Sequence, residues 1–330
     1  MKKFRLLTLI AAMFAFVLVG CSSGNGNANG ANDANDGAKN NATEQNAAEE
    51  TTADQKEIDA AVQDIKKKGK LVLATSADYP PYEWHLLKDG KDEIVGFDIE
   101  IAKELADSLD VELEIKDLDF EGIIPSLASG QADIAIAGLS TTPERLNAVN
   151  MSIPYFENKQ VALVPKDKAD QYKSMDDFAG KVVAAQTGSL QENTVRENFP
   201  KDVELKSLPR INNLALEVKN GTADALVISI SAGEQYAKQF PELVAIKVGI
   251  PDEPGVCIAT QKDNDGLTAY VNQELKKMID EGKIDEWFNE YEKISSESVG
   301  AEDAESADAG NNSSNNDNAA NQNDANNAKN

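Results

Sequence analysis

The chain has 330 residues, with 57 acidic side chains against 32 basic ones and a formal net charge of −25. This acidity argues against a nucleic-acid binder, because neutralising phosphates requires an excess of Lys and Arg. A single histidine and two cysteines argue against a multi-histidine metal centre and a disulfide framework, so we expect no metal and no cofactor.

The N-terminus is typical of an export signal. Three basic residues precede an apolar run over 6–19, which is shorter than the ~20 residues that a membrane-spanning helix needs. The run ends in Leu-Val-Gly-Cys, which resembles the bacterial lipobox. We therefore predict a signal peptide over 1–20 and acylation (palmitate) of Cys21, the alternatives being an uncleaved anchor or a cleaved signal with an incidental cysteine.

Two stretches, 21–58 and 295–330, consist of Asn, Ala, Ser, Gly, Asp and Glu with almost no large apolar side chain. Such a composition buries too little surface to offset the entropy of ordering. We predict a disordered tether over 21–58 and a disordered Asn-rich tail over 295–330. A short helix is predicted over 59–69, with an amphipathic pattern that is traceable from Ala53 to Lys68.

The middle of the chain alternates between predicted strands and helices. The first elements are a strand over 70–75, a helix over 96–110, a strand over 111–115, a helix over 120–129 and a strand over 132–137. In the first of these helices apolar residues recur every fourth position, which gives one buried stripe: Phe97, Ile101, Leu105 and Leu109. Alternating elements with uninterrupted apolar strands indicate an α/β fold with mainly parallel sheets.

Two phrases recur in the same order. The sequence Gly-Lys-Leu-Val-Leu-Ala at 69–74 is echoed by Gly-Lys-Val-Val-Ala-Ala at 180–185, and Gly-Gln-Ala-Asp at 130–133 by Gly-Thr-Ala-Asp at 221–224. A glycine that stops a helix before an apolar strand occurs in any α/β protein. Two such echoes in order, however, indicate two lobes of similar plan.

The chain is predicted to cross between these lobes twice. A strand-like passage over 157–165 leads into the second lobe, and a strand over 256–260 leads back toward helices over 267–281 and 284–291. The predicted first lobe is 70–160 plus 251–294, and the second is 161–250. Two crossings form a two-strand hinge, so we expect closure about a central cleft.

Candidate ligand-binding residues follow the strands, because ligands of open α/β sheets bind beyond the carboxyl ends of the strands. The loop over 75–84 carries two prolines and three aromatics, of which Tyr79 is the expected ligand contact, whereas Tyr82 and Trp84 are expected to pack internally. Later, Ser140 offers a hydroxyl and Arg145 lies in the first turn of a helix that Thr142 begins. A guanidinium beside a helix N-terminus suits a carboxylate.

The second lobe offers donors of the same kind. Gln186 and Ser189 lie where the strand after 180 ends and a helix opens, and Ser229 ends the strand after the second Gly-x-Ala-Asp phrase. Cys257 is expected to be a small buried residue. His85 is expected to be an exposed loop residue.

Residues 70–293 resemble the amino-acid-binding solute receptors of ABC importers, the extracellular solute-binding protein family 3 of the glutamine/histidine/arginine-binding type. The phrases that carry the resemblance are Tyr-Pro-Pro-Tyr-Glu at 79–83, Gly-Phe-Asp-Ile-Glu-Ile-Ala at 96–102, Phe-Glu-Gly-Ile-Ile-Pro-Ser-Leu at 120–127, Ala-Gly-Leu-Ser-Thr-Thr-Pro-Glu-Arg at 137–145, Gln-Thr-Gly-Ser at 186–189 and Asp-Glu-Gly-Lys at 280–283. Their order and spacing make the match specific.

The resemblance implies a bilobed periplasmic-binding-protein-like fold (type II), without catalytic residues, that closes on an amino acid or related small carboxylate. It also implies delivery of the ligand to the permease subunits of an ABC transporter from the outer face of the cell membrane. By family pattern Tyr79 and Phe120 sandwich the ligand side chain and Gln186 contacts the ligand from the second lobe. The residues that would hold the α-carboxylate are Ala137, Gly138, Ser140 and Arg145, assisted by Ser189.

The chain departs from the family pattern at two positions. Many relatives carry Asp where this chain has Ser229, and that Asp holds the α-ammonium group. Many also carry Asp where this chain has Ser76, which contacts the ammonium group or a basic side chain. Because a buried ammonium needs a counter-charge, either Asp78, Glu83 or another carboxylate substitutes, or the ligand is not a standard α-amino acid. Basic amino acids are disfavoured for the same reason.

Two alternatives to transport use the same scaffold. A few relatives are dehydratases, and in such an enzyme the acid or base would come from Asp78, Glu83, Glu121 or His85. A ligand-sensing surface protein would bind its ligand without feeding a permease. Uptake in a deletion strain distinguishes sensing from transport.

Overall fold

The computed structural model describes residues 55–297. The predicted signal peptide (1–20), the acylation site Cys21, most of the tether and most of the Asn-rich tail lie outside the described residues. No helix in the described range is both long enough and apolar enough to cross a membrane.

The first sheet has five strands in the order β5-β1-β6-β13-β7. Their bounds are β1 (Lys70–Thr75), β5 (Glu112–Asp117), β6 (Ile134–Ala135), β7 (Val149–Met151) and β13 (Ala259–Gln261). Strand β1 pairs in parallel with β5 and β6, whereas β13 runs antiparallel to β6 and β7.

The second sheet repeats this plan in the order β10-β9-β11-β8-β12. Its strands are β8 (Gln160–Pro165), β9 (Val182–Gln186), β10 (Glu204–Leu208), β11 (Ala225–Ser229) and β12 (Leu243–Ile246). Strand β9 is parallel to β10 and β11, and β8 is antiparallel to β11 and β12.

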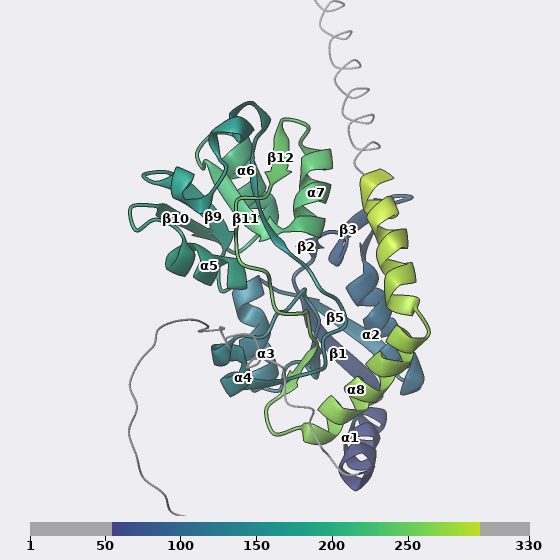
Figure 1. Cartoon of the computed structure of the whole chain (residues 1–330). Coiled ribbons are helices and arrows are strands. Elements are labelled where there is room, and N and C mark those ends of the chain that lie inside the picture. The colour runs from purple at the N-terminus through teal and green to yellow at the C-terminus, as the bar shows by residue number, and fades with distance from the viewer. Residues whose placement is uncertain (1–54, 298–330) are drawn as a thin grey trace, which may run out of the picture. The chain divides into compact units, whose positions relative to one another are not determined.

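Both sheets are therefore mainly parallel, as predicted, because four of the five strands in each run the same way and one strand is reversed. The strands that run against the others, β8 and β13, are those that the chain reaches by crossing between the sheets. Parallel strands need a covering crossover connection, whereas a strand that arrives along the hinge has no such constraint. The bilobed α/β fold itself is confirmed, and Figure 1 shows the two lobes joined by two long passages.

A third, three-stranded sheet lies beside the first lobe, where the sequence predicted only a loop. It is an antiparallel meander of β2 (Asp78–Tyr79), β3 (Glu83–Lys88) and β4 (Lys91–Val95). Asp89 and Gly90 join β3 to β4 with φ angles of 53° and 74°. A two-residue Asp-Gly turn with positive φ is the preferred connection of a β-hairpin.

Helices cover both sheets. The first lobe carries α1 (Gln55–Lys68), α2 (Phe97–Ser108), α3 (Ile123–Ala128), α4 (Pro143–Ala148), α8 (Asp265–Asp280) and a last helix that is described from 283 to 297. The second lobe carries α5 (Leu190–Asn198), α6 (Ile211–Lys219) and α7 (Ile230–Gln239). Short 3₁₀ turns occupy Phe120–Gly122, Lys166–Gln171 and Met175–Phe178. The stripe predicted for α2 is confirmed, since all four of its apolar residues are buried.

Two predicted boundaries differ from the structure. Helix α1 begins at Gln55, inside the range predicted as tether, because Ile58 is buried and α1 packs closely on α8. A Cβ at Gly266 would lie 2.3 Å from the Glu57 carbonyl oxygen, so the two helices meet at a glycine. The last helix continues to residue 297, inside the range predicted as tail, because Ser295 is buried and Ser296 hydrogen-bonds Gln235 of α7.

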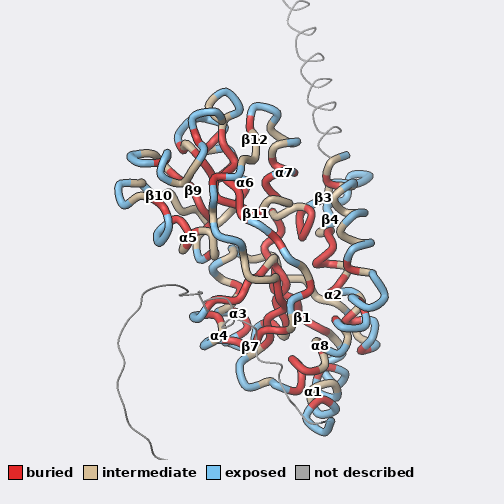
Figure 2. Tube along the Cα trace, viewed as in Figure 1, coloured by how far each residue is buried: buried red, intermediate tan, exposed pale blue. Residues whose placement is uncertain are grey.

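Each five-stranded sheet has a buried core on both faces, seen as the red interior of Figure 2. Alternate residues of β1 point to opposite faces, so that Leu71 and Leu73 belong to one cluster and Val72 and Ala74 to the other. Strands buried on both faces form a rigid support, and their carboxyl ends hold the site in place.

Candidate ligand-binding site

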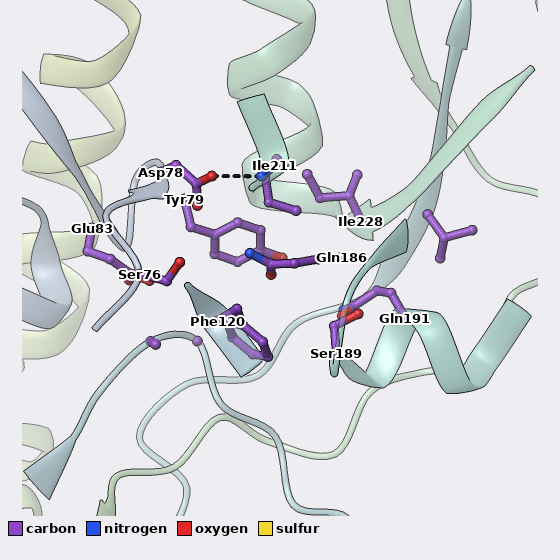
Figure 3. A pocket seen from close by; sticks show the side chains of 13 residues that line it. Ser76, Asp78, Tyr79, Glu83, Phe120, Gln186, Ser189, Gln191, Ile211 and Ile228 are labelled. Carbon is purple, nitrogen blue, oxygen red and sulfur yellow. Dashed lines mark hydrogen bonds between the residues drawn. The ribbon is translucent and has the colours of Figure 1, made fainter. Parts of the chain in front are cut away.

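A cavity lies where the carboxyl ends of the two sheets face each other, as expected for this class of fold, with about 380 Å³ of space between its atoms, including space open to solvent. Its first-lobe wall consists of Ser76, Asp78, Tyr79, Glu83, Phe120, Ala137 and Gly138. Its second-lobe wall consists of Gln186, Ser189, Gln191, Ile211, Val227 and Ile228. Figure 3 shows these side chains converging on one space.

Seven of the ten residues predicted to bind ligand line this cavity: Ser76, Tyr79, Phe120, Ala137, Gly138, Gln186 and Ser189. The other three lie just behind its wall. Ser229 hydrogen-bonds Tyr79, Ser140 hydrogen-bonds Glu253, and Arg145 lines an adjoining cavity of about 660 Å³ together with Phe120 and Gly188.

Two aromatic rings, of Tyr79 and Phe120, reach the cavity from the first lobe (Figure 3). Tyr79 stacks on the buried ring of Tyr82 at 5.2 Å between centroids, and Tyr82 packs on Phe97 at 4.8 Å. Gly138 has a φ of 55°, and a Cβ there would lie 3.2 Å from the Tyr79 ring. Position 138 therefore requires glycine for both its conformation and its close approach to Tyr79.

One end of the cavity is acidic. Ser76, Asp78 and Glu83 are each less than 5% exposed, and Ser76 Oγ, Asp78 Oδ1 and Glu83 Oε2 have no hydrogen-bond partner among the described residues. The other Asp78 oxygen accepts a 2.6 Å hydrogen bond from the backbone N–H of Ile211 at the start of α6. Buried oxygens without partners are costly unless a ligand satisfies them.

The burial of these acids changes their proton affinity. Burial raises the pKa of Asp78 to about 6, against the lowering effect of the Ile211 N–H. Burial also raises the pKa of Glu83 well above its ordinary value, and the neighbouring Asp98 raises it further. A cation placed between Asp78 and Glu83 would favour their charged forms, so the acidic end is suited to a positively charged group.

Asp98 fixes the backbone beside the cavity. Its two oxygens accept hydrogen bonds from the Gly138 N–H at 3.0 Å and the Tyr155 hydroxyl at 2.8 Å. These bonds hold the loop that follows β6 against Tyr79.

Arg145 lines the adjoining cavity, beside Phe120 and Gly188. Thr142 caps α4 by accepting a hydrogen bond from the Arg145 N–H, with Pro143 in the first turn, as the sequence predicted. The guanidinium lies 5.4 Å from the Phe120 ring centroid and donates to the carbonyls of Ser140 at 2.7 Å and Gly188 at 3.2 Å. The residue is only 7% exposed, and burial lowers its pKa to about 10. A buried guanidinium that bonds carbonyls rather than an acid is suited to a carboxylate ligand.

The two lobes are in contact around the cavity. Tyr79 donates a 2.6 Å hydrogen bond to Ser229, and Tyr236 of α7 donates a 2.8 Å bond to the carbonyl of Asp78. Arg210, which precedes α6, forms ion pairs of 2.9 Å with Asp117 and Asp119 of the first lobe. The described conformation is therefore closed.

Several residues in and beside the cavity escaped prediction. Gln191 lies two residues beyond the Gln-Thr-Gly-Ser phrase, in the first turn of α5, and Ile211 and Val227 are apolar residues without a chemical signature. Glu253 lies in the Pro-Asp-Glu-Pro segment of the second crossing and bonds both Ser140 and Gln191. Its two flanking prolines were the only signal of a fixed conformation there.

The remaining expectations concern residues away from the cavity. Tyr82 and Trp84 are buried, as expected, and Cys257 is buried with a pKa that burial raises to about 12. His85 has an exposed side chain but lies in β3 rather than in a loop, with its ring nitrogens on Asp92 and Asp117. Residues 55–297 hold no cluster of three or more His, Cys, Asp or Glu side chains placed to bind a metal ion.

Comparison with known proteins identifies relatives that match about two thirds of the chain. Over 230 residues the chain is 38% identical to the arginine-binding extracellular protein ArtP of Bacillus subtilis, which covers 67% of this chain and 87% of that protein. It superposes on the amino acid ABC transporter substrate-binding protein AbpA of Streptococcus pneumoniae bound to L-arginine, with a TM-score of 0.69, 35% identity and coverage of 71% of this chain and 98% of that one.

A third match concerns the enzymatic alternative. The ancestral amino-acid-binding protein AncCDT-1, a precursor of cyclohexadienyl dehydratase, matches with a TM-score of 0.64 and 35% identity over 70% of this chain and 98% of that one. ArtP and the ABC transporter arginine-binding protein 1 of Escherichia coli, which is 31% identical over 66% of this chain and 90% of that protein, are binding proteins rather than enzymes. The model of the bacterial extracellular solute-binding proteins, family 3, matches residues 71–293, and the chain belongs to that family.

Proposed function

We propose that this protein is the lipid-anchored binding component of an ABC importer and that its ligand is a cationic amino acid, with arginine as the first candidate. The observation that carries the proposal is the polarity of the closed cleft. Unpartnered acidic oxygens of Asp78 and Glu83 line one end, and the buried guanidinium of Arg145 lies beyond the other.

A cationic amino acid matches this polarity because it carries an α-carboxylate at one end and a positive charge at the other. Arg145 and Ser140 receive the carboxylate, and the rings of Tyr79 and Phe120 enclose the aliphatic stem. The distal cation lies between Ser76, Asp78 and Glu83. Two charged hydrogen bonds of ~1.5–3 kcal/mol each at the acidic end are enough to favour arginine over glutamine by several orders of magnitude.

The expectation against basic amino acids depended on the serines at positions 76 and 229. Substitution by Asp78 or Glu83 was left open, and both of these carboxylates, from β2 and β3, line the cavity. That ArtP and AbpA are arginine-binding proteins supports the same ligand class.

Calorimetry with arginine, lysine, ornithine, histidine and glutamine tests the proposal. We expect arginine to bind and glutamine to bind at least about 100-fold more weakly. Asp78→Asn and Glu83→Gln should each reduce arginine affinity by about tenfold or more. Glu197→Gln is the matched control, because Glu197 of α5 is exposed and lines neither cavity, and the same charge is removed. Equal affinity for arginine and glutamine would contradict the proposal.

The lipid anchor and the permease are proposed from the lipobox-like ending at Cys21 and from the family. Expression with a radiolabelled fatty acid should label the wild-type chain and leave Cys21→Ser unlabelled in the soluble fraction. Deletion of the gene should abolish high-affinity uptake of the ligand that calorimetry identifies. Normal uptake in the deletion strain would favour the sensing alternative.

A further inference from the structure

A third carboxylate, that of the partly buried Glu253, lies beside the cleft, where it contacts Ser140 and the cavity residue Gln191. It belongs to the segment that returns the chain from the second lobe to the first. Glu253 Oε1 accepts a 3.1 Å hydrogen bond from Gln191 of α5, and Oε2 accepts a 3.4 Å bond from the hydroxyl of Ser140. One acid is thus held by a donor from each lobe.

Among residues 55–297, Arg145 is the basic group that acts on the charge of Glu253, and no ion pair joins the two. The titratable groups that face it are Arg145 of α4 and the two hydroxyl groups of Tyr79 and Tyr82, and Arg145 directs its own hydrogen bonds to carbonyls. Burial raises the pKa of Glu253 to about 7, and its two donors and Arg145 only partly oppose this effect. A further cation beside Glu253 would favour its ionised form.

The position of the ligand's α-ammonium follows from its chemistry. The α-ammonium and the α-carboxylate are bonded to the same carbon, so the acid that balances the ammonium must lie beside the groups that hold the carboxylate. Residue 229 offers only a hydroxyl, which already accepts a hydrogen bond from Tyr79. Asp78, Glu83 and Ser76 lie on the opposite side of Tyr79 from Gln191, the hydrogen-bond partner of Glu253 (Figure 3). Glu253 instead shares the hydroxyl of Ser140.

We infer that Glu253 is the acidic group that pairs with the α-ammonium of the ligand and so selects α-amino acids over the corresponding acids without an amino group. The inference rests on the proposed function. The cleft then has two acidic positions, with Asp78 and Glu83 for the distal cation and Glu253 for the α-ammonium. Glu253 comes from the hinge, so its contact with the ligand also stabilises the closed form.

The test compares L-arginine with 5-guanidinopentanoate, which is arginine without its α-amino group, by calorimetry at pH 7.5. The wild-type chain should bind arginine about tenfold or more tightly than the analogue. In Glu253→Gln arginine affinity should fall to near that of the analogue, while affinity for the analogue stays the same or rises. Glu253→Asp keeps the charge and should retain part of the preference. Glu197→Gln should leave the preference unchanged.

A second readout is proton release at pH 6.5, measured in two buffers of different ionisation enthalpy. Wild-type protein should release more protons on binding arginine than Glu253→Gln does, because the ammonium ionises Glu253. Thermal unfolding and circular dichroism establish that each variant is folded.

The outcomes separate the inference from the function. Arginine binding with an unchanged preference in Glu253→Gln overturns the inference alone. Tighter arginine binding by that variant also overturns the inference. Glu253 would then occupy the position of the ligand carboxylate in the ligand-free protein, and the ligand would have to displace it. Failure of the wild-type chain to bind any cationic amino acid overturns the proposed function and this inference with it.

Discussion

Replacing Arg145 by methionine distinguishes a guanidinium kept for a ligand from one that supports the fold. The side chain is 7% exposed, and burial lowers its pKa to about 10. This lowering of the pKa, from 12.5 to about 10, corresponds to roughly 3 kcal/mol of stability that the ligand-free protein loses by burying the charge. The variant recovers this cost but leaves the carbonyls of Ser140 and Gly188 without a donor, at about 1 kcal/mol or more each.

In the ligand-free protein, the recovered cost of burying the charge and the loss of the two hydrogen bonds to carbonyls nearly cancel. In the complex they do not, because the ligand carboxylate also loses its charged partner. We therefore expect the free energy of unfolding of Arg145→Met to stay within about 1–2 kcal/mol of the wild-type value. Arginine affinity should fall by about 100-fold or more, because a bidentate charged pair with the α-carboxylate is lost. Arg145→Lys keeps the charge without the planar fork and should recover only part of the affinity.

Urea unfolding without ligand and calorimetry with arginine give the two quantities separately. The ligand role would be falsified by two results together: a loss of more than about 3 kcal/mol in the free energy of unfolding of Arg145→Met, and normal arginine binding by the folded fraction of that variant. That result would make Arg145 a structural link between α4 and the second lobe.

Three further predictions concern pH, closure and the aromatic wall. Burial raises the pKa values of Asp78 and Asp98 to about 6 and that of Glu253 to about 7, so the folded chain binds more protons than the unfolded chain between about pH 4 and 7. Without ligand, the free energy of unfolding should therefore fall by about 3 kcal/mol or more from pH 4.5 to 7.5, and the fall should be smaller with arginine bound. Urea titrations that show a rise in this free energy would contradict the prediction. Arg210→Ala removes two ion pairs between the lobes and should increase the radius of gyration of the ligand-free protein in X-ray scattering, with arginine affinity reduced less than about tenfold. Gly138→Ala should lower stability by about 1–3 kcal/mol and weaken arginine binding through a shift of Tyr79, and wild-type values for both would refute the need for glycine.

The two-lobed plan was predictable because the repeated phrases have the same structural role in each sheet. Asp133 accepts a 2.8 Å hydrogen bond from the Val72 N–H and donates its own N–H to the Val72 carbonyl at 2.9 Å. Asp224 makes the same pair of bonds with Val182, at 3.0 and 2.7 Å. In both lobes the Gly-x-Ala-Asp phrase thus ties the start of a strand, β6 or β11, to the neighbouring parallel strand, β1 or β9, and the sequence echo records this constraint.

Strand direction and the third sheet were not predictable in the same way. An apolar strand has the same composition whether it pairs parallel or antiparallel, so nothing in 157–165 or 256–260 indicated the reversed strands of the hinge. The Asp-Gly pair at 89–90 is typical of a hairpin turn, but it predicts a hairpin only if the residues on both sides are predicted to be strands. Charged residues on both flanks obscured that pattern.

The pairing of β2 with β3 also explains why the sequence did not decide which carboxylate supplies negative charge to the site. Strand β2 pairs with β3 so that Tyr79 is directly opposite Glu83, and cross-strand partners have side chains on the same face of a sheet. Knowledge of that register would have placed Glu83 beside the predicted ligand contact Tyr79. The sequence showed the carboxylate four residues from Tyr79 but not the pairing.

Glu253 required more than local register, because 113 residues separate it from Ser140 and its place depends on the second crossing between the lobes. A serine at a position where relatives carry Asp does not by itself remove negative charge from a site. What the ligand experiences is the sum of the buried groups that face it, from whichever elements they come. In this chain β2, β3 and the hinge supply those acids, so a cationic ligand is compatible with serine at both 76 and 229.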